Sequence, residues 1–291
     1  MFDRKILKSR AKVVLSRSFF MTLIACSIVS FASSGGIGFS TQRLQGISFA
    51  NMSHIRVAAI FAVMGLLVIA GIAFLILVTS PLMVGLKYFM LRTADGETNL
   101  ENLLYPFKNG YKNIVLVQFV KNLYIILWSL LGLIPMLIGF WKFGLYEEIE
   151  ELVLAIQNDS VTSAFSLMTM MSGLSILTLI FSVPGLIKEL QYSMVDYILA
   201  DDPYMSPSKA IGRSKEMMVG NKWPLVKLSL SFVGWYFAAN LFCCLGSLIL
   251  RPYIEATYAQ MYLEISGQSK DYTNYTAPNN PFDSFGGFGN L

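Results

Sequence analysis

Residues 57–83 contain no charged side chain, and this segment limits what the chain can fold into more than any other feature of its sequence. A helix needs about 20 mostly apolar residues to cross the hydrocarbon core of a bilayer, and the segment exceeds that length. The composition agrees with a membrane helix, because 55% of the residues are hydrophobic and only 14% are charged. In soluble proteins about a quarter of the residues are charged. We therefore expect an all-α protein, a polytopic integral membrane helix bundle.

The sequence predicts about six transmembrane helices. They cover approximately residues 19–39, 57–83, 115–140, 164–200, 225–242 and 245–263. The fourth is too long for one straight crossing, so we expect a kink at Pro184. The last two come from one long apolar stretch, which we divide at the sequence CCLGS. Alternatively there are five spans, and residues 246–265 lie on the outer surface as an amphipathic helix.

A single transmembrane domain over residues 1–265 follows from this interpretation. The remaining residues, 266–291, are rich in Gly, Asn, Ser and Pro and show no apolar periodicity. We expect them to form a flexible C-terminal tail.

Basic residues predict the orientation of the spans. Six of them precede the first span: Arg4, Lys5, Lys8, Arg10, Lys12 and Arg17. Residues 143–183 contain no Lys or Arg and carry the acidic sequence YEEIEE. Because cytoplasmic loops hold the excess of Lys and Arg, we expect a multi-pass protein of the cell membrane with a cytoplasmic N-terminus and, given six spans, a cytoplasmic C-terminus. A cleaved signal peptide is the alternative, since Ser30 and Ala32 resemble a cleavage site.

A basic amphipathic helix is predicted between two apolar stretches. Ser206 is the expected N-cap, Pro207 the first helical residue, and Gly220 the end of the helix. Such a helix lies flat on the cytoplasmic leaflet, where anionic headgroups hold it at about 1 kcal/mol per Lys or Arg. The candidate surface for anionic lipid or a partner consists of Lys209, Arg213, Lys215 and Lys222.

Ionisable residues at membrane depth are the strongest candidates for a functional site, because a charge at mid-bilayer costs about 3 kcal/mol. The candidate intramembrane polar cluster consists of Lys188, Glu189, Tyr192, Asp196, Arg251 and Glu255. Lys188 is expected to pair with Asp196 or Glu189, and Arg251 with Glu255, four residues further along the same helix. The cluster then holds helices together, or alternatively lines a path for a substrate or protons.

Catalytic and metal-binding motifs are missing from the sequence. It contains no His-Glu-x-x-His, Gly-x-Ser-x-Gly, P-loop or dinucleotide fingerprint, and its one histidine, His54, is expected in a polar loop. The three cysteines show no zinc or redox spacing and are expected to be small core residues: Cys26, Cys243 and Cys244. The adjacent Asp201 and Asp202 point about 100° apart on a helix, so they do not converge as an aspartyl pair. We expect no enzyme activity, no cofactor and no metal.

Several stretches resemble one bacterial membrane family. They are LWSLLGLIP, VPGLIKELQYSMVDYILADDP, SKAIGRSKEMMVGNKWPL, and LSFVGWYF through PYIEATYAQMY. Together they resemble the integral membrane family called domain of unknown function 975, most strongly over residues 127–263 and more loosely over the first two spans. In that family LWSLL is followed almost at once by IPGIIK, whereas here an acidic segment and part of the fourth span lie between Leu131 and Val183. The resemblance implies a membrane fold and no particular chemistry.

Two classes of function are consistent with these features. The first, which we favour, is a non-catalytic integral membrane protein that binds another membrane protein, lipid or an envelope component. The alternative is a small membrane transporter or export or immunity factor with a polar path near Lys188 and Asp196. Membrane lipid and a further membrane protein are the expected partners, and nucleic acid is not, because the net charge of +4 is concentrated beside predicted spans.

Overall fold

The computed structural model describes residues 3–33, 54–142, 161–241 and 245–268, and their regular secondary structure is entirely helical. Contacts between residues divide the chain into two compact units. Unit 1 comprises residues 1–118 and 194–291, and unit 2 comprises residues 119–193. A single domain over residues 1–265 stays a prediction.

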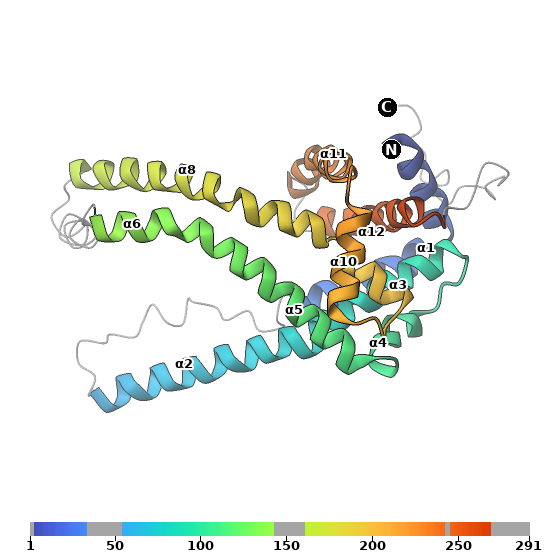
Figure 1. Ribbon diagram of the computed structural model, residues 1–291, viewed down its shortest axis with the longest axis horizontal. Helices are drawn as coiled ribbons and strands as arrows, with labels where there is room; N and C mark the ends of the chain where they lie inside the picture. Colours follow the sequence, from blue (N-terminus) through green and yellow to red (C-terminus); the bar gives the residue numbers. More distant parts are fainter. Residues whose placement is uncertain (1–2, 34–53, 143–160, 242–244, 269–291) are drawn as a thin grey trace. The chain divides into compact units, whose positions relative to one another are not determined.

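The uncharged segment belongs to one long helical stretch in unit 1 (Figure 1). It consists of α2 (His54–Phe74), a π-helical turn η3 (Leu75–Thr79) and α3 (Ser80–Ala94). His54, which we expected in a loop, is therefore the first residue of α2. Several large apolar side chains along α2 are more than half exposed, among them Leu66 and Ile69, whereas α3 is mostly buried.

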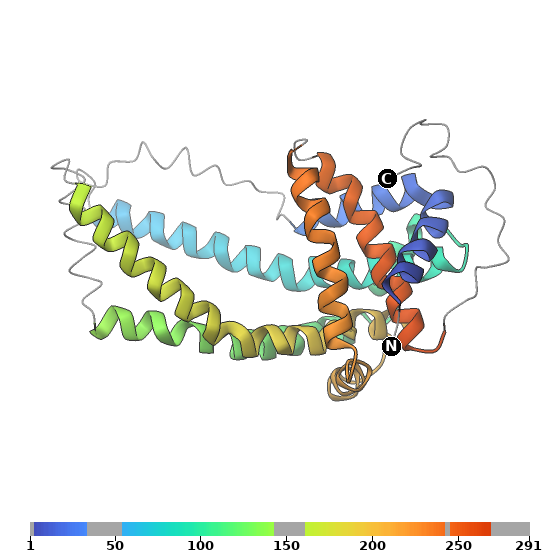
Figure 2. The ribbon, with the colours of Figure 1, turned by 90° about the horizontal axis from the view of Figure 1, so that it is seen from above.

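The core of unit 1 forms where helices from distant parts of the chain cross. Helix α12 (Leu245–Ile265) packs against α1 (Arg4–Ser33), α3 and α11 (Lys222–Leu241), and Figure 2 shows α11 and α12 side by side. The buried Ala11 and Leu15 of α1 meet Ala256 of α12, and the small side chains of the two alanines let the helices approach closely. Helix α1 has a non-helical residue at Ser18, which separates its basic first part from its apolar second part.

Unit 2 is a helical pair whose two sides touch through small residues. One side contains the end of α5 (Tyr111–Ser129), the 3₁₀ turn η5 (Leu130–Leu133) and α6 (Ile134–Lys142), and the other is α8 (Val161–Tyr192). Gly132 lies against Ser182, and Gly185 lies against Ser129. Helix α8 continues through Pro184, and the chain leaves the helix at Ser193 and Met194, before α9 (Val195–Asp201).

Three helices in the described ranges are long and apolar enough to cross a membrane: Arg4–Ser33, Ala62–Ala94 and Tyr111–Leu133. They overlap the predicted spans 19–39, 57–83 and 115–140. The other three predicted spans coincide with helices α8 and α9, α11 and α12. Their passage through a membrane stays a prediction.

The start of α5 is hydrogen-bonded to the loop between α9 and the next helix, α10 (Pro207–Met217). The amide nitrogen of Asn113 donates hydrogen bonds to the carbonyl oxygens of Pro203 and Met205, both at 2.8 Å. Gly110 has a φ of +68°, and a Cβ there would lie 2.7 Å from the carbonyl oxygen of Pro203. The close passage of the two backbones thus depends on a glycine and an asparagine.

Replacing Asn113 with alanine is expected to lower the free energy of unfolding by about 1–2 kcal/mol, because two hydrogen bonds are lost together. Asn221→Ala is the matched control, since Asn221 donates only one bond, to the carbonyl of Met217 on the preceding turn. Unfolding in mild detergent, followed by circular dichroism as a denaturing detergent is added, measures both losses. Equal losses in the two variants would show that Asn113 does not fasten the loop.

Candidate functional site

A buried ion pair lies where α3 and α12 cross. Lys87 and Glu255 are 9% and 8% exposed, and the ammonium of Lys87 pairs with the carboxylate of Glu255. The same ammonium lies 5.2 Å from the ring centroid of Tyr197 on α9. One cation therefore connects three helices, and a cation over an aromatic ring gains a further attraction when both are removed from water.

Aromatic and polar groups continue from this pair through the interior of unit 1. The ring of Tyr197 stacks on that of Tyr262, with centroids 5.1 Å apart, and the Tyr262 hydroxyl donates to Asp201. The side-chain amide of Gln118 donates to Asp196 at 2.8 Å. Among the described residues, the hydroxyl of Tyr197 is buried and has no hydrogen-bond partner.

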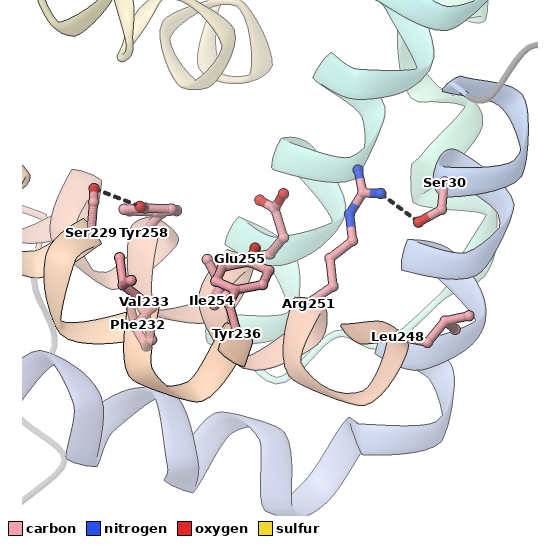
Figure 3. A pocket seen from close by; sticks show the side chains of 10 residues that line it. All are labelled: Ser30, Ser229, Phe232, Val233, Tyr236, Leu248, Arg251, Ile254, Glu255 and Tyr258. Carbon is pink, nitrogen blue, oxygen red and sulfur yellow. Dashed lines mark hydrogen bonds between the residues drawn. The ribbon is translucent and has the colours of Figure 1, made fainter. Parts of the chain in front are cut away.

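A cleft opens beside the ion pair, between α1, α11 and α12 (Figure 3). Its volume is about 570 Å³. At one end the guanidinium of Arg251 donates to the hydroxyl of Ser30, and at the other the hydroxyls of Ser229 and Tyr258 are hydrogen-bonded at 2.9 Å. Much of the remaining wall is apolar and comes from Phe232, Val233, Leu248 and Ile254, while Glu255 lies between the two polar ends.

The expected ion pair between Arg251 and Glu255 is wrong. Glu255 pairs with Lys87 on α3, and Arg251 turns to the hydroxyl of Ser30 on α1. Spacing along one helix allowed the first pairing, but the crossing of α3 brings a second cation into the interior. Burial favours that pairing because Lys87 and Glu255 are both removed from water, and a buried charge is costly unless an opposite charge pairs with it.

The other members of the predicted cluster lie in both units. In unit 2, the ammonium of Lys188 lies 4.6 Å from the ring centroid of Trp128, the buried Tyr192 ring contacts Tyr124, and Glu189 is exposed. The expected pairing of Lys188 with Glu189 is therefore replaced by a cation–π contact. Asp196 belongs to unit 1, where it accepts the hydrogen bond from Gln118.

Sequence reasoning missed Lys87, Tyr197 and Gln118. The available signal was Lys87 itself, a single basic residue that is followed by the apolar sequence YFML. An aromatic residue and an amide in apolar sequence carry no comparable signal, because their partners are far along the chain.

The predicted basic helix is present as α10, while its place on the cytoplasmic leaflet stays a prediction. Ser206 is its N-cap with extended backbone and Pro207 its first residue, although the Ser206 side chain makes no capping bond. Gly220 follows with a φ of +76°. One side is buried and packs against α9, through Ala210, Ile211 and Ser214. Of the predicted surface, Lys209, Arg213 and Lys215 are exposed, and Lys222, the first residue of α11, is half-buried.

Among the described residues, no group of three or more His, Cys, Asp or Glu side chains could hold a metal ion. Cys26 is buried, as expected of a core residue. Cys243, Cys244, the acidic sequence YEEIEE and nearly all of the predicted tail lie outside the described residues.

The described chain is thus a helical protein with three helices able to cross a membrane, and it buries charge while exposing apolar side chains. The sequence pattern of the family described as protein of unknown function DUF975 matches residues 1–269. The chain therefore belongs to this family, which confirms the resemblance found in the sequence. Comparison with curated proteins and with solved structures finds no match.

Proposed function

We propose that the protein is a non-catalytic integral membrane protein that binds anionic membrane components through the exposed basic side of α10. One observation carries the membrane part of this proposal. Leu66 and Ile69 of α2 are each 69% exposed, while Lys87 and Glu255 are buried. Contact between such an apolar surface and water is unfavourable in free energy, whereas contact with the hydrocarbon of a bilayer is not.

The proposed topology has six crossings of the cell membrane. They are made by α1, α2 with α3, α5 with α6, α8, α11 and α12. The basic start of α1 and the basic α10 then lie on the cytoplasmic side, together with both termini, as the distribution of Lys and Arg favours.

The proposed binding surface is the exposed side of α10, which carries Lys209, Arg213 and Lys215. The small and apolar side of this helix packs against α9, and its charged side is exposed. Three exposed cations at about 1 kcal/mol each correspond to about 100-fold in affinity for an anionic surface. Anionic phospholipid of the same leaflet is the nearest ligand of that chemistry.

Neutralising Lys209, Arg213 and Lys215 as glutamines is expected to reduce the attraction of α10 to anionic lipid by about 100-fold. An environment-sensitive dye on Ser208→Cys, with Cys243 and Cys244 replaced by serine, reports contact with the leaflet in nanodiscs. The dye is expected to shift when phosphatidylglycerol is added to phosphatidylcholine, and the triple variant to lose that shift.

Glu216→Gln is the matched control, because it removes an acidic group from the exposed side of the same helix. This variant is expected to contact the leaflet at least as strongly as the parent chain. An unchanged dye shift in the triple variant would refute the proposed binding surface. Labelling of Ser208→Cys from outside intact cells would refute the topology.

One observation favours the second candidate, a small transporter or export or immunity factor. Glu255 lines the cleft and also pairs with the buried Lys87, so the cleft reaches a charged pair in the interior. Of the two residues near which the path was predicted, Lys188 and Asp196, Asp196 accepts a hydrogen bond from Gln118. Loss of uptake or resistance in Asp196→Asn at an unchanged protein level would support transport, and a loss of protein level alone would support a structural role.

A further inference from the structure

We propose that the cleft between α1, α11 and α12 binds one anionic phospholipid, whose phosphate is held by Arg251. The inference rests on the membrane part of the proposed function and is independent of the α10 surface. Figure 3 shows the groups that would surround such a lipid.

The charges at the cleft leave one cation without an anion. The carboxylate of Glu255 is neutralised by Lys87, so it does not repel an incoming anion. Arg251 donates to the neutral hydroxyl of Ser30, and it forms no ion pair with any carboxylate in the described part of the chain. The segments that follow α1 and precede α12 in the sequence, 34–53 and 242–244, contain no Asp or Glu. The cleft therefore has a net positive charge.

An anionic headgroup is the group that matches this charge. The planar guanidinium has donors to spare after its bond to Ser30, and it can bind a phosphate with two parallel hydrogen bonds. A cation that is partly buried in an apolar setting is costly until it is paired. A phosphate beside Arg251 removes that cost by pairing with the guanidinium. A zwitterionic lipid pairs with it less strongly, because the cation of its own headgroup also attracts the phosphate.

The walls of the cleft suit the glycerol and the adjoining part of the acyl chains. Val233 and Leu248 are 40% and 37% exposed, and with Phe232 and Ile254 they offer an apolar surface for hydrocarbon. The hydroxyls of Ser229 and Tyr258, which are hydrogen-bonded to each other, form a polar end of the cleft opposite Arg251. A volume of about 570 Å³ lies within the usual range for ligand sites, about 300–1,000 Å³.

Native mass spectrometry of the full chain in mild detergent tests the proposal. Phosphatidylglycerol and phosphatidylcholine with identical acyl chains are the probes. One phosphatidylglycerol is expected to bind more tightly than phosphatidylcholine, and Arg251→Gln is expected to weaken it by about 10- to 100-fold, as loss of a charge-assisted hydrogen bond predicts. Equal binding of the two lipids, or unchanged binding to Arg251→Gln, would overturn the proposal.

Two further variants keep the test decisive if Arg251→Gln fails to fold. Val233→Trp fills the cleft from an exposed position and is expected to weaken both lipids, while Arg251→Lys keeps the charge and is expected to bind with intermediate affinity. The triple variant of α10 is the control and is expected to keep the bound phospholipid. If that variant loses it while Val233→Trp does not, the lipid lies on α10 and the cleft proposal is wrong.

Discussion

Lys87→Met is expected to lower the free energy of unfolding by about 3–5 kcal/mol, because it leaves the Glu255 carboxylate buried without a partner. Glu255→Leu is expected to have a similar effect by leaving the ammonium of Lys87 unpaired. The double variant removes both charges and keeps apolar side chains of comparable length. It is expected to recover most of the loss, since well-packed apolar groups replace buried ion pairs with little net cost.

Arg10→Met is the matched control for this buried pair. Arg10 on α1 pairs with Glu264 on α12 at 2.7 Å, so this pair also joins α12 to another helix. The side chains of Arg10 and Glu264 are 19% and 37% exposed. A more solvated pair of this kind contributes about 1 kcal/mol or less. Unfolding in mild detergent with a denaturing detergent compares all four variants. If Lys87→Met costs no more than Arg10→Met, the charged pair does not hold the helix crossing together.

Gly85→Ala is expected to lower the free energy of unfolding by about 3 kcal/mol, at the upper end of the range for overpacking. A Cβ at this position would overlap the carbonyl oxygen of Leu103 in the 3₁₀ turn η4 (Leu100–Leu104), which packs against α3. The contact is with backbone, so no side chain can turn away to relieve it. The ring of Tyr88 on α3 also stacks on that of Tyr105, the residue directly after η4, with centroids 3.9 Å apart.

Gly212→Ala is the matched control, because a methyl group at this glycine has free space and is not expected to lower the free energy of unfolding. Gly212 lies inside α10, and a Cβ there would meet no atom within 4 Å. Alanine favours a helix over glycine by about 1 kcal/mol, so this variant is expected to be unchanged or slightly more stable. The same detergent titration measures both variants. A loss in Gly85→Ala no larger than in Gly212→Ala would contradict the close approach of η4 to α3.

Features that depend on neighbouring residues were predictable from the sequence. The cap at Ser206, the first helical residue Pro207 and the buried and exposed sides of α10 all follow from local preferences and helical periodicity. The apolar helices were equally evident, because length and composition define them. The family resemblance was carried by short stretches within these same elements and is confirmed over residues 1–269.

Features that depend on distant residues were not predictable. The partner of Glu255 is Lys87, far away in the sequence, and a search along one helix found Arg251 instead. The π-helical turn η3 has no local signal in LILVT, since such a turn depends on how the helices on either side are packed. The predicted cluster therefore paired Glu255 with Arg251, whereas Glu255 pairs with Lys87 and Arg251 donates to Ser30.

The π-helical turn η3 separates two parts of one long helix that face different surroundings. Before it, none of the described side chains of α2 is buried, and beyond it α3 is enclosed by other helices. A widened turn absorbs a one-residue change in register, which in a regular helix would rotate everything beyond it by about 100°. Substitutions among apolar residues should therefore accumulate freely in α2, while α3 is restricted at almost every position.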